Sequence, residues 1–360
     1  MSPLSYLLKK HYYRHQDKRQ AQVRQVEEEQ FRQQYFAMFS PAGKTKVCTY
    51  QTGFSRHYTR FFTSSDAQEH SFFLVEDPAE ASVVVFINTI DDSVLRPDQR
   101  AILFFHEPLD YAHLYQSKIN EARCEKSNLE VVSHLPSPSL FIKNPEGIAF
   151  HRSIPYVHFH HMATPEQLKS IDGGPRTRQI CSMTSGLNGI PGYQKRAHFI
   201  KLFSEANKGF DLFGRFSKQA AGIRAYRGPS KIKWKTISEY KYNLVIENSR
   251  DDFYISEKIF DALICGCMPI YHGSDKIFEI LPKEWFYYLP TLEASEIDRL
   301  NAFVATDAYK VVAENRASIA RYIHEHFSFY GALEKLLARE PLVLPSPESM
   351  HPTHLGEARR

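Results

Sequence analysis

Short apolar runs recur along most of this chain and constrain its fold more than any other feature. They are rich in β-branched and aromatic residues and lack the alternation of polar and apolar positions that a half-buried strand shows. Such runs are typical of strands that are buried on both faces of a parallel sheet. The clearest are VCTYQT (47–52), ASVVVFIN (81–88), RAILFFHEP (100–108), LEVVSHL (129–135), RQICSMTS (178–185) and NLVIEN (243–248).

Helical patterns lie between and after these runs, for example YQKRAHFIKLFSEA (193–206), EKIFDALIC (257–265) and the long segment 309–327. Strands that alternate with helices predict doubly wound parallel sheets. A length of 360 residues is enough for two domains of ordinary size. The polar, Gly- and Pro-containing stretch 163–178 marks the break between them. We therefore expect an α/β protein with two Rossmann-like domains that face a central cleft.

The expected boundaries follow from these patterns. Residues 1–40 form a charged helical extension, 41–170 the N-terminal domain, 171–340 the C-terminal domain and 341–360 a Pro-rich tail that is extended or disordered. The extension, helical over about 5–37, is expected to be a solvated helix packed on the first domain. The alternative is peripheral membrane association, with apolar residues near its start against lipid.

Composition narrows the function classes. A net charge of +4 does not call for nucleic acid, although it suits an anionic small substrate or a negatively charged membrane surface. The five cysteines are scattered, and we interpret them as buried thiols in a reducing compartment. No apolar window is long enough for a transmembrane helix, and the start of the chain does not resemble a signal peptide. The expected location is a cytoplasm, a bacterial one in our interpretation, and the oligomeric state stays open.

Ligands of open α/β sheets bind beyond the carboxyl ends of the strands. Glu107 follows directly on the apolar run 101–105, and Pro108 then ends the ladder. A carboxylate in that position is suited to act as a general base, with His106 as a candidate partner. The alternative is a helix N-cap or a satisfied edge carboxylate, and position alone does not exclude it.

A second candidate site lies where the strand 243–248 ends and the helix EKIFDALIC begins. Ser256 is placed to cap this helix, whose free N–H groups and dipole suit a phosphate. Lys258 adds a formal charge, and Glu257 can accept both hydroxyls of a ribose. The alternative is that Glu257 only complements the positive end of the helix dipole and that Lys258 is solvated. Arg196 and Arg215 lie upstream, and a bidentate cation suits a pyrophosphate, although Arg196 could equally be a surface residue.

The segment YKYNLVIENSRDDFYISEKIFDALICGCMPIYHGSDKI (240–277) resembles the donor-binding signature of the α-1,3-fucosyltransferases, glycosyltransferase family 10. That signature runs YKF-x-L-x-FENS, a loop, YITEK, a helix and G-x-VPVV-x-G. The resemblance extends less strictly over about 100–290. The departures are His106 and Pro108 around Glu107, Ile246 for a phenylalanine, and MPIY (268–271) in place of the valine-rich strand.

The resemblance implies a GT-B fold and an inverting transfer of fucose from GDP-fucose, with α-1,3-type linkage and no requirement for a divalent metal. It implies that Arg196 and Lys258 neutralise the diphosphate, that Glu257 holds the ribose, and that Asn248 and Tyr254 line the donor pocket. It also implies that Glu107 is the base that deprotonates an acceptor hydroxyl. No tightly bound cofactor is expected, because GDP-fucose is a substrate.

The sequence also bears on other kinds of site and function. The adjacent pairs Asp91-Asp92 and Asp251-Asp252 do not form the Asp-x-Asp motif of a metal-dependent transferase, and a metal site at His158 and His160 lacks a nearby carboxylate or thiolate. A related GT-B transferase for another nucleotide sugar in bacterial lipopolysaccharide or capsule assembly stays open, as does a non-catalytic nucleotide-binding homologue. The expected acceptor is an oligosaccharide or lipid-linked glycan at the inner face of the membrane. The loops 50–75 and 106–125 would hold it.

Overall fold

The structure is a computed structural model. It describes residues 7–16, 40–50, 70–112, 128–155, 174–186, 190–215, 222–230 and 232–347, and isolated residues at positions 18, 19, 22, 26, 29, 33, 217 and 220. The histidines at 158 and 160, most of the loop 50–75 and the end of the tail lie outside these residues.

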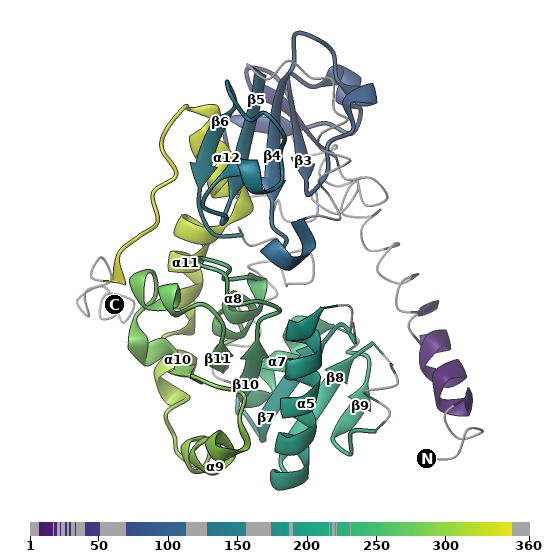
Figure 1. Ribbon diagram of the computed structural model, residues 1–360, viewed down its shortest axis with the longest axis vertical. Coiled ribbons are helices and arrows are strands. Elements are labelled where there is room, and N and C mark those ends of the chain that lie inside the picture. Colours follow the sequence, from purple (N-terminus) through teal and green to yellow (C-terminus); the bar gives the residue numbers. More distant parts are fainter. Residues whose placement is uncertain are drawn as a thin grey trace.

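The N-terminal domain contains a parallel sheet, with strand order β2-β1-β3-β4-β5-β6 among the described residues (Figure 1). Its core strand VVVFI is buried at every position, as a strand covered on both faces must be. The strands are β1 (Thr45–Tyr50), β2 (Phe72–Leu74), β3 (Val83–Ile87), β4 (Arg100–Phe105), β5 (Leu129–Ser133) and β6 (Ala149–Arg152). Short 3-10 turns lie at Pro78–Glu80, Asp92–Val94 and Pro138–Leu140.

The C-terminal domain contains a second parallel sheet, ordered β12-β11-β10-β7-β8-β9. Its strands are β7 (Arg178–Thr184), β8 (Phe210–Gly214), β9 (Tyr226–Gly228), β10 (Tyr240–Ile246), β11 (Met268–His272) and β12 (Tyr287–Tyr288). Its helices are α5 (Pro191–Ala206), α7 (Lys233–Ser238), α8 (Glu257–Ile264), α9 (Ile297–Val304), α10 (Lys310–Glu314) and α11 (Arg316–Phe327). Further 3-10 turns lie at Asp275–Glu279, Lys283–Trp285 and Ala294–Glu296. Two parallel sheets with helices confirm the α/β class that the sequence predicts.

One helix connects the two domains. α12 (Phe329–Leu337) follows α11 of the C-terminal domain but packs into the N-terminal core through Phe329, Leu333 and Leu336. The Arg100 guanidinium on β4 donates to the carbonyl oxygen of Leu336 at 2.6 Å. α12 lies within residues 171–340, which we expected to belong wholly to the C-terminal domain. Its apolar face is instead part of the first domain's core (Figure 1).

The extension and the tail both contact the body of the protein. Residues 7–16 are helical, and the Tyr13 ring lies 5.4 Å from that of Tyr226 in the C-terminal domain, edge to face. The described part of this helix therefore contacts the C-terminal domain. In the tail, Leu342 packs against the core of the N-terminal domain and Leu344 against that of the C-terminal domain.

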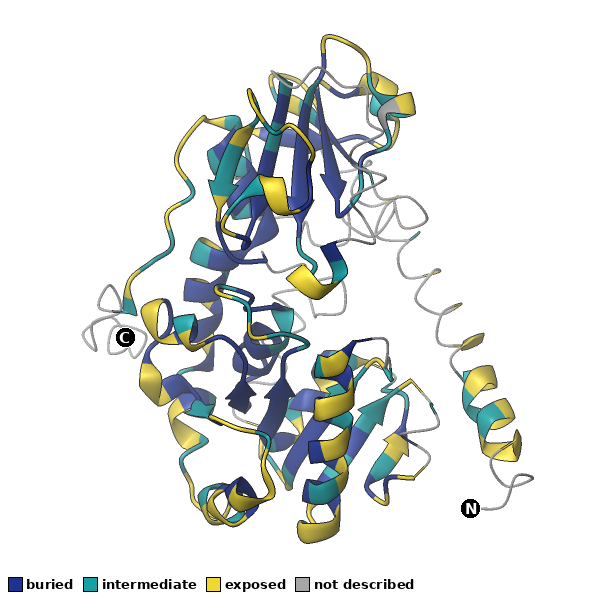
Figure 2. Cartoon of the chain, in the orientation of Figure 1, coloured by how far each residue is buried: buried dark blue, intermediate teal, exposed yellow. Residues whose placement is uncertain are grey.

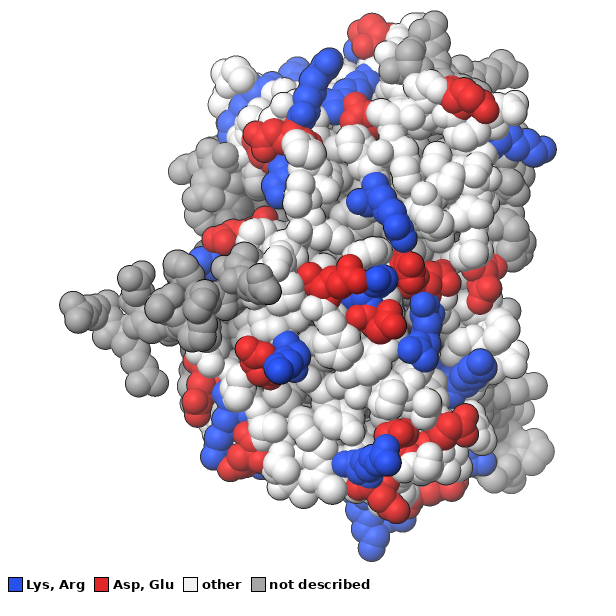
Figure 3. Space-filling model, turned by 60° about the vertical axis from the view of Figure 1, so that its left-hand side comes forward, with Lys and Arg blue, Asp and Glu red and all other residues white. Residues whose placement is uncertain are grey.

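Burial and charge agree with the composition. Both sheets form buried cores (Figure 2), and the four described cysteines are free and buried. Acidic and basic side chains are interspersed over the face drawn in Figure 3, as a net charge of +4 allows. Among the described residues, no helix is both long and apolar enough to cross a bilayer.

Candidate active site

The site lies where the loops after β4 and β10 meet. The backbone N–H of Leu109, two residues beyond Glu107, donates to Oδ2 of Asp251 in the C-terminal domain at 2.8 Å. The rings of Tyr111 and Tyr193, again one from each domain, have centroids 6.0 Å apart. The carboxyl ends of strands from both sheets therefore converge, as the general rule for α/β sheets leads one to expect.

Glu107 is half-buried at this junction. Its Oε1 accepts a hydrogen bond of 3.2 Å from the side-chain amide of Asn88, which follows β3. Burial raises the pKa of Tyr193 and Tyr254 in the C-terminal domain, and the negative charge of Glu107 adds to both shifts. The carboxylate therefore lies close enough to the C-terminal domain for its field to reach residues there.

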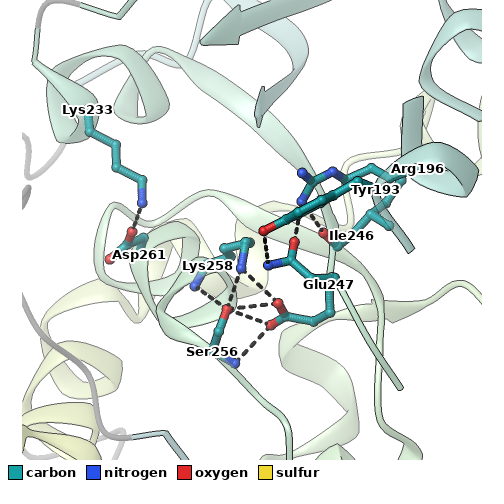
Figure 4. A network of polar contacts seen from close by, with 9 residues as sticks. Tyr193, Arg196, Lys233, Ile246, Glu247, Ser256, Lys258 and Asp261 are labelled. Atoms are coloured by element: carbon teal, nitrogen blue, oxygen red, sulfur yellow. Dashed lines mark hydrogen bonds and ion pairs between the residues drawn. The ribbon is translucent and has the colours of Figure 1, made fainter. Parts of the chain in front are cut away.

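A network of polar contacts surrounds Glu247 at the end of β10 (Figure 4). The Glu247 side chain is fully buried and accepts from the Ser256 backbone N–H at 2.9 Å and from the Ser256 hydroxyl at 2.8 Å. Lys258 Nζ donates to Glu247 Oε2 at 2.9 Å and to Ser256 Oγ at 2.7 Å. An ammonium has three donors. The structure thus orients Lys258 through two of them at the start of α8.

Arg196 on α5 is buried beside this network. Its Nη1 donates to Asn248 Oδ1 at 2.7 Å, and its guanidinium lies 4.9 Å from the centre of the Tyr193 ring. The Asn248 amide in turn donates to the Tyr193 hydroxyl at 3.3 Å. Burial lowers the pKa of Arg196, which the negative charges of Glu247 and others oppose, and a guanidinium stays protonated in either case. Arg196 is thus a buried, oriented cation and not a surface residue.

The other residues that the sequence predicts to bind the donor differ in their burial and contacts. Glu257 is half-buried in the first turn of α8, and its charge acts on Arg196 and, across the domain junction, on His106. Tyr254 is buried with its ring 5.0 Å from that of His134. Arg215, directly after β8, is exposed and takes no part in the network that the structure describes. The fold therefore gathers five of the six predicted donor residues, and Arg215 stands apart.

Two glycines permit the close approach of these elements. A Cβ on Gly192 would lie 1.7 Å from the Asn248 carbonyl oxygen, so only glycine lets α5 come this near to the end of β10. A Cβ on Gly273 would lie 2.8 Å from Cγ of Glu247. Gly273 directly follows β11.

The acidic pairs weighed as metal sites have other contacts. Asp91 accepts from Ser93 and from the Tyr50 hydroxyl. Asp251 accepts from Leu109, and Asp252 lies 3.7 Å from Arg152 of the N-terminal domain. In the part of the chain that the structure describes, no group of three or more His, Cys, Asp or Glu side chains is arranged to hold a metal ion.

Sequence reasoning assigned no role to several residues of this site. Glu247 and Ser256 were recognised only as parts of a motif and a cap, and Asn88 only as the last residue of an apolar run. A polar residue at the carboxyl end of a buried strand was the available signal for both Asn88 and Glu247. The buried ion pair of Lys233 with Asp261, which joins α7 to α8 beside the site (Figure 4), gave no such signal.

Comparison with known proteins identifies the C-terminal domain. Residues 175–293 match the family described as glycosyltransferase family 10 (fucosyltransferase) C-term. A putative fucosyltransferase of Acanthamoeba polyphaga mimivirus is 20% identical over 302 residues, which are 78% of this chain and 46% of that protein. An α-(1,4)-fucosyltransferase of Arabidopsis thaliana is 41% identical over 46 residues, 13% of this chain and 12% of that protein. The chain spans less than half the length of either relative.

Solved structures resemble most of the chain. A DNA-modifying β-glucosyltransferase superposes with a TM-score of 0.52 at 10% identity, over 82% of this chain and 99% of that one. An α1,3-fucosyltransferase superposes with a TM-score of 0.44 at 14% identity, over 81% of this chain and 94% of that one. The two-sheet architecture is therefore the GT-B fold of glycosyltransferases, and residues 175–293 match the C-terminal domain of the glycosyltransferase family 10 fucosyltransferases.

Proposed function

We propose that this protein transfers fucose from GDP-fucose to a hydroxyl group of a glycan acceptor, with inversion at the anomeric carbon. One observation carries the proposal. The family 10 match contains Arg196, Asn248 and Lys258, and the fold gathers these three beside a half-buried carboxylate, Glu107, of the other domain.

On the donor side, Arg196, Lys258 and the N-terminus of α8 bind the diphosphate. The two cations and the helix dipole offset the charge that develops on the departing GDP, so the proposed chemistry does not require a divalent metal. Glu257 accepts the ribose hydroxyls, and Asn248 and Tyr254 line the pocket.

Arg215 is a further proposed contact of the donor. Its exposed side chain must reach the donor from the solvent side, whereas Arg196 and Lys258 are already held in place by protein groups.

On the acceptor side, Glu107 is the general base. The acceptor oxygen attacks the anomeric carbon from the face opposite the nucleotide, the bond from that carbon to the phosphate oxygen breaks, and Glu107 takes the proton of the acceptor hydroxyl. The electron pair of the broken bond leaves with GDP. An oligosaccharide or lipid-linked glycan, α-1,3 linked in the product, is the acceptor that we propose, at the cytoplasmic face of a membrane.

The test is transfer from GDP-fucose to a panel of oligosaccharides, followed by mass spectrometry. Glu107→Gln is expected to lower kcat by about 10²- to 10⁴-fold, the usual contribution of a general base. Glu146→Gln, which alters an exposed carboxylate of the same domain, is the control and should match the parent. Transfer from other GDP- or UDP-sugars in preference to GDP-fucose would refute the donor. Full activity of Glu107→Gln would refute the base.

A further inference from the structure

Asn88 makes an unusual set of contacts with the strand that carries Glu107. It is buried, with 9% of its surface exposed, and its backbone N–H donates to the Phe104 carbonyl oxygen at 2.9 Å. Its side-chain Oδ1 accepts from the backbone N–H of His106 at 2.8 Å, and its Nδ2 donates to Glu107 Oε1 at 3.2 Å. One side chain from the end of β3 thus binds the main chain just before Glu107 and the Glu107 carboxylate itself.

These contacts determine which way the amide points. A backbone N–H can only donate, so the amide oxygen must face His106, and the amide nitrogen must then face Glu107. The reverse orientation would set a donor against a donor and an oxygen against a carboxylate. The N–H group that reaches Glu107 is therefore imposed by the main chain and is in place before any substrate binds.

The backbone of Asn88 shows that this placement is specific. Its φ of 61° lies in the left-handed region, which asparagine tolerates better than most residues. This conformation turns the chain at the end of β3 and directs the side chain back towards the end of β4. A residue needed only to end the strand could be glycine. The amide adds the contact with Glu107.

We propose that Asn88 is a positioning residue for the general base: its amide holds the Glu107 carboxylate in one orientation and in its charged, proton-accepting form. The inference rests on the proposed function. A hydrogen bond to the charged form of an acid favours that form, so Asn88 keeps the base ready at lower pH and fixes the oxygen that faces the acceptor hydroxyl.

Two variants separate this role from a purely structural one. Asn88→Gly retains the left-handed backbone and removes the amide. Asn88→Asp retains shape and the acceptor for His106 but sets a carboxylate oxygen against Glu107. Asn144→Gly is the control, because Asn144 is an exposed residue of the same domain with a φ of 49°.

Burial moves the pKa of three groups near Glu107 further from neutrality. Burial lowers the pKa of His106 to about 3, and it raises the pKa of Tyr193 and Tyr254. The titratable and charged groups near Glu107 are His106 and Tyr111 after β4, His134 after β5, Tyr193 and Arg196 on α5, and Tyr254 and Glu257 around the start of α8. The parent and Asn88→Asp share all of these groups, so a shift of the acidic limb between the two reports on the pair of residues 88 and 107.

The experiment measures kcat and KM for GDP-fucose, melting temperature, and rate against pH. Asn88→Gly is expected to lower kcat by about 10- to 100-fold, the effect of one hydrogen bond to a charged group, with KM for GDP-fucose close to that of the parent. In a Glu107→Gln background the same change should cause no further loss, because Asn88 acts through Glu107. Asn88→Asp should move the acidic limb of the profile to higher pH, and its melting temperature at neutral pH should fall, because two carboxylates then face each other.

Three results overturn the inference. The first is a parental kcat in Asn88→Gly. The second is a loss that is as large in the Glu107→Gln background as in the parent. The third is an unchanged pH profile in Asn88→Asp. If the parent itself transfers no fucose, the proposed function fails and the inference fails with it. If the parent is active but changes at Asn88 have no effect, only the inference fails.

Discussion

The buried network around Glu247 allows a quantitative prediction. Glu247→Gln preserves the shape of the side chain but removes its charge and one acceptor oxygen. The carboxylate now accepts from the Ser256 N–H, the Ser256 hydroxyl and the Lys258 ammonium, at 2.8 to 2.9 Å. The variant cannot satisfy all three donors, and the Lys258 charge loses its counterion.

The size of the effect follows from burial. Removing one partner of a fully buried ion pair costs about 3–5 kcal/mol, and a hydrogen bond to a charged group contributes about 1.5–3 kcal/mol. Glu247 is fully buried, but the Lys258 side chain retains 22% exposure and can turn to water. We therefore expect a loss of about 2–3 kcal/mol, below the fully buried case. This corresponds to a fall in Tm of roughly 5–10 °C for a domain of this size.

The assay is thermal unfolding, with chemical denaturation as a check. Glu279→Gln is the matched control, because Glu279 pairs with Lys276 at 2.6 Å with both side chains solvent-accessible. Exposed pairs contribute less than about 1 kcal/mol. Lys258→Met should cost less in the Glu247→Gln background than in the parent. If Glu247→Gln is no less stable than Glu279→Gln, or if the effects of the Glu247 and Lys258 changes simply add, the network does not stabilise the site as argued.

Three further predictions concern the domain junction and the first domain. Asp251→Ala removes the acceptor of the Leu109 N–H and should lower kcat while the affinity for GDP, measured by calorimetry, stays near that of the parent. Glu130→Gln should lower Tm at neutral pH, and the difference in Tm between variant and parent should become smaller as the pH falls. Burial acts to raise the pKa of Glu130, but hydrogen bonds from His151 and Arg100 lower it to about 2, so the stabilisation is complete above about pH 4.5 and is lost towards pH 2. Glu334→Gln weakens the bonds of α12 to the Ser71 N–H, at 2.9 and 3.2 Å, and should speed proteolysis after α11.

A specific result would contradict each of these three predictions. Equal losses of kcat and GDP affinity in Asp251→Ala would mean that the loop serves the donor pocket and not the junction. A Tm difference for Glu130→Gln that is independent of pH would contradict ionic stabilisation. An unchanged cleavage pattern in Glu334→Gln would show that apolar packing alone holds α12.

Most of the fold could be predicted because its strands are buried on both faces. The six apolar runs quoted first all became strands, among them β3, β4 and β10. The short strands β2, β6 and β9 were not expected, since three or four residues carry too little periodicity.

The helical end of the chain was harder to predict. The segment 309–327 was expected as one helix but divides at Asn315, and Ser328 caps α12, which was not expected. Apolar periodicity does not tell which domain a helix covers.

The candidate site was predictable at the level of segments and not of contacts. Lys258 was singled out from its position at a helix start, Arg196 from its bidentate positive charge, and Asn248 from the family resemblance. Lys258 binds Glu247, eleven residues earlier, because β10 and α8 pack together. No local sequence pattern encodes this contact. Asn88 was missed for the same reason, because its importance arises from a left-handed turn and from the neighbouring strand. The roles of these residues in catalysis stay predictions until they are tested.

The placement of α12 has a consequence for how the protein is made. Synthesis is vectorial, so the first sheet leaves the ribosome well before the helix that completes its core. Residues 153–337 are translated in between, which takes roughly 10 to 40 s at bacterial and eukaryotic elongation rates. During this interval the apolar surface that Phe329 and Leu333 will cover is open to water or to a chaperone. A ribosome stalled before residue 329 should therefore display a nascent N-terminal domain that is more sensitive to protease than the same residues in the finished chain.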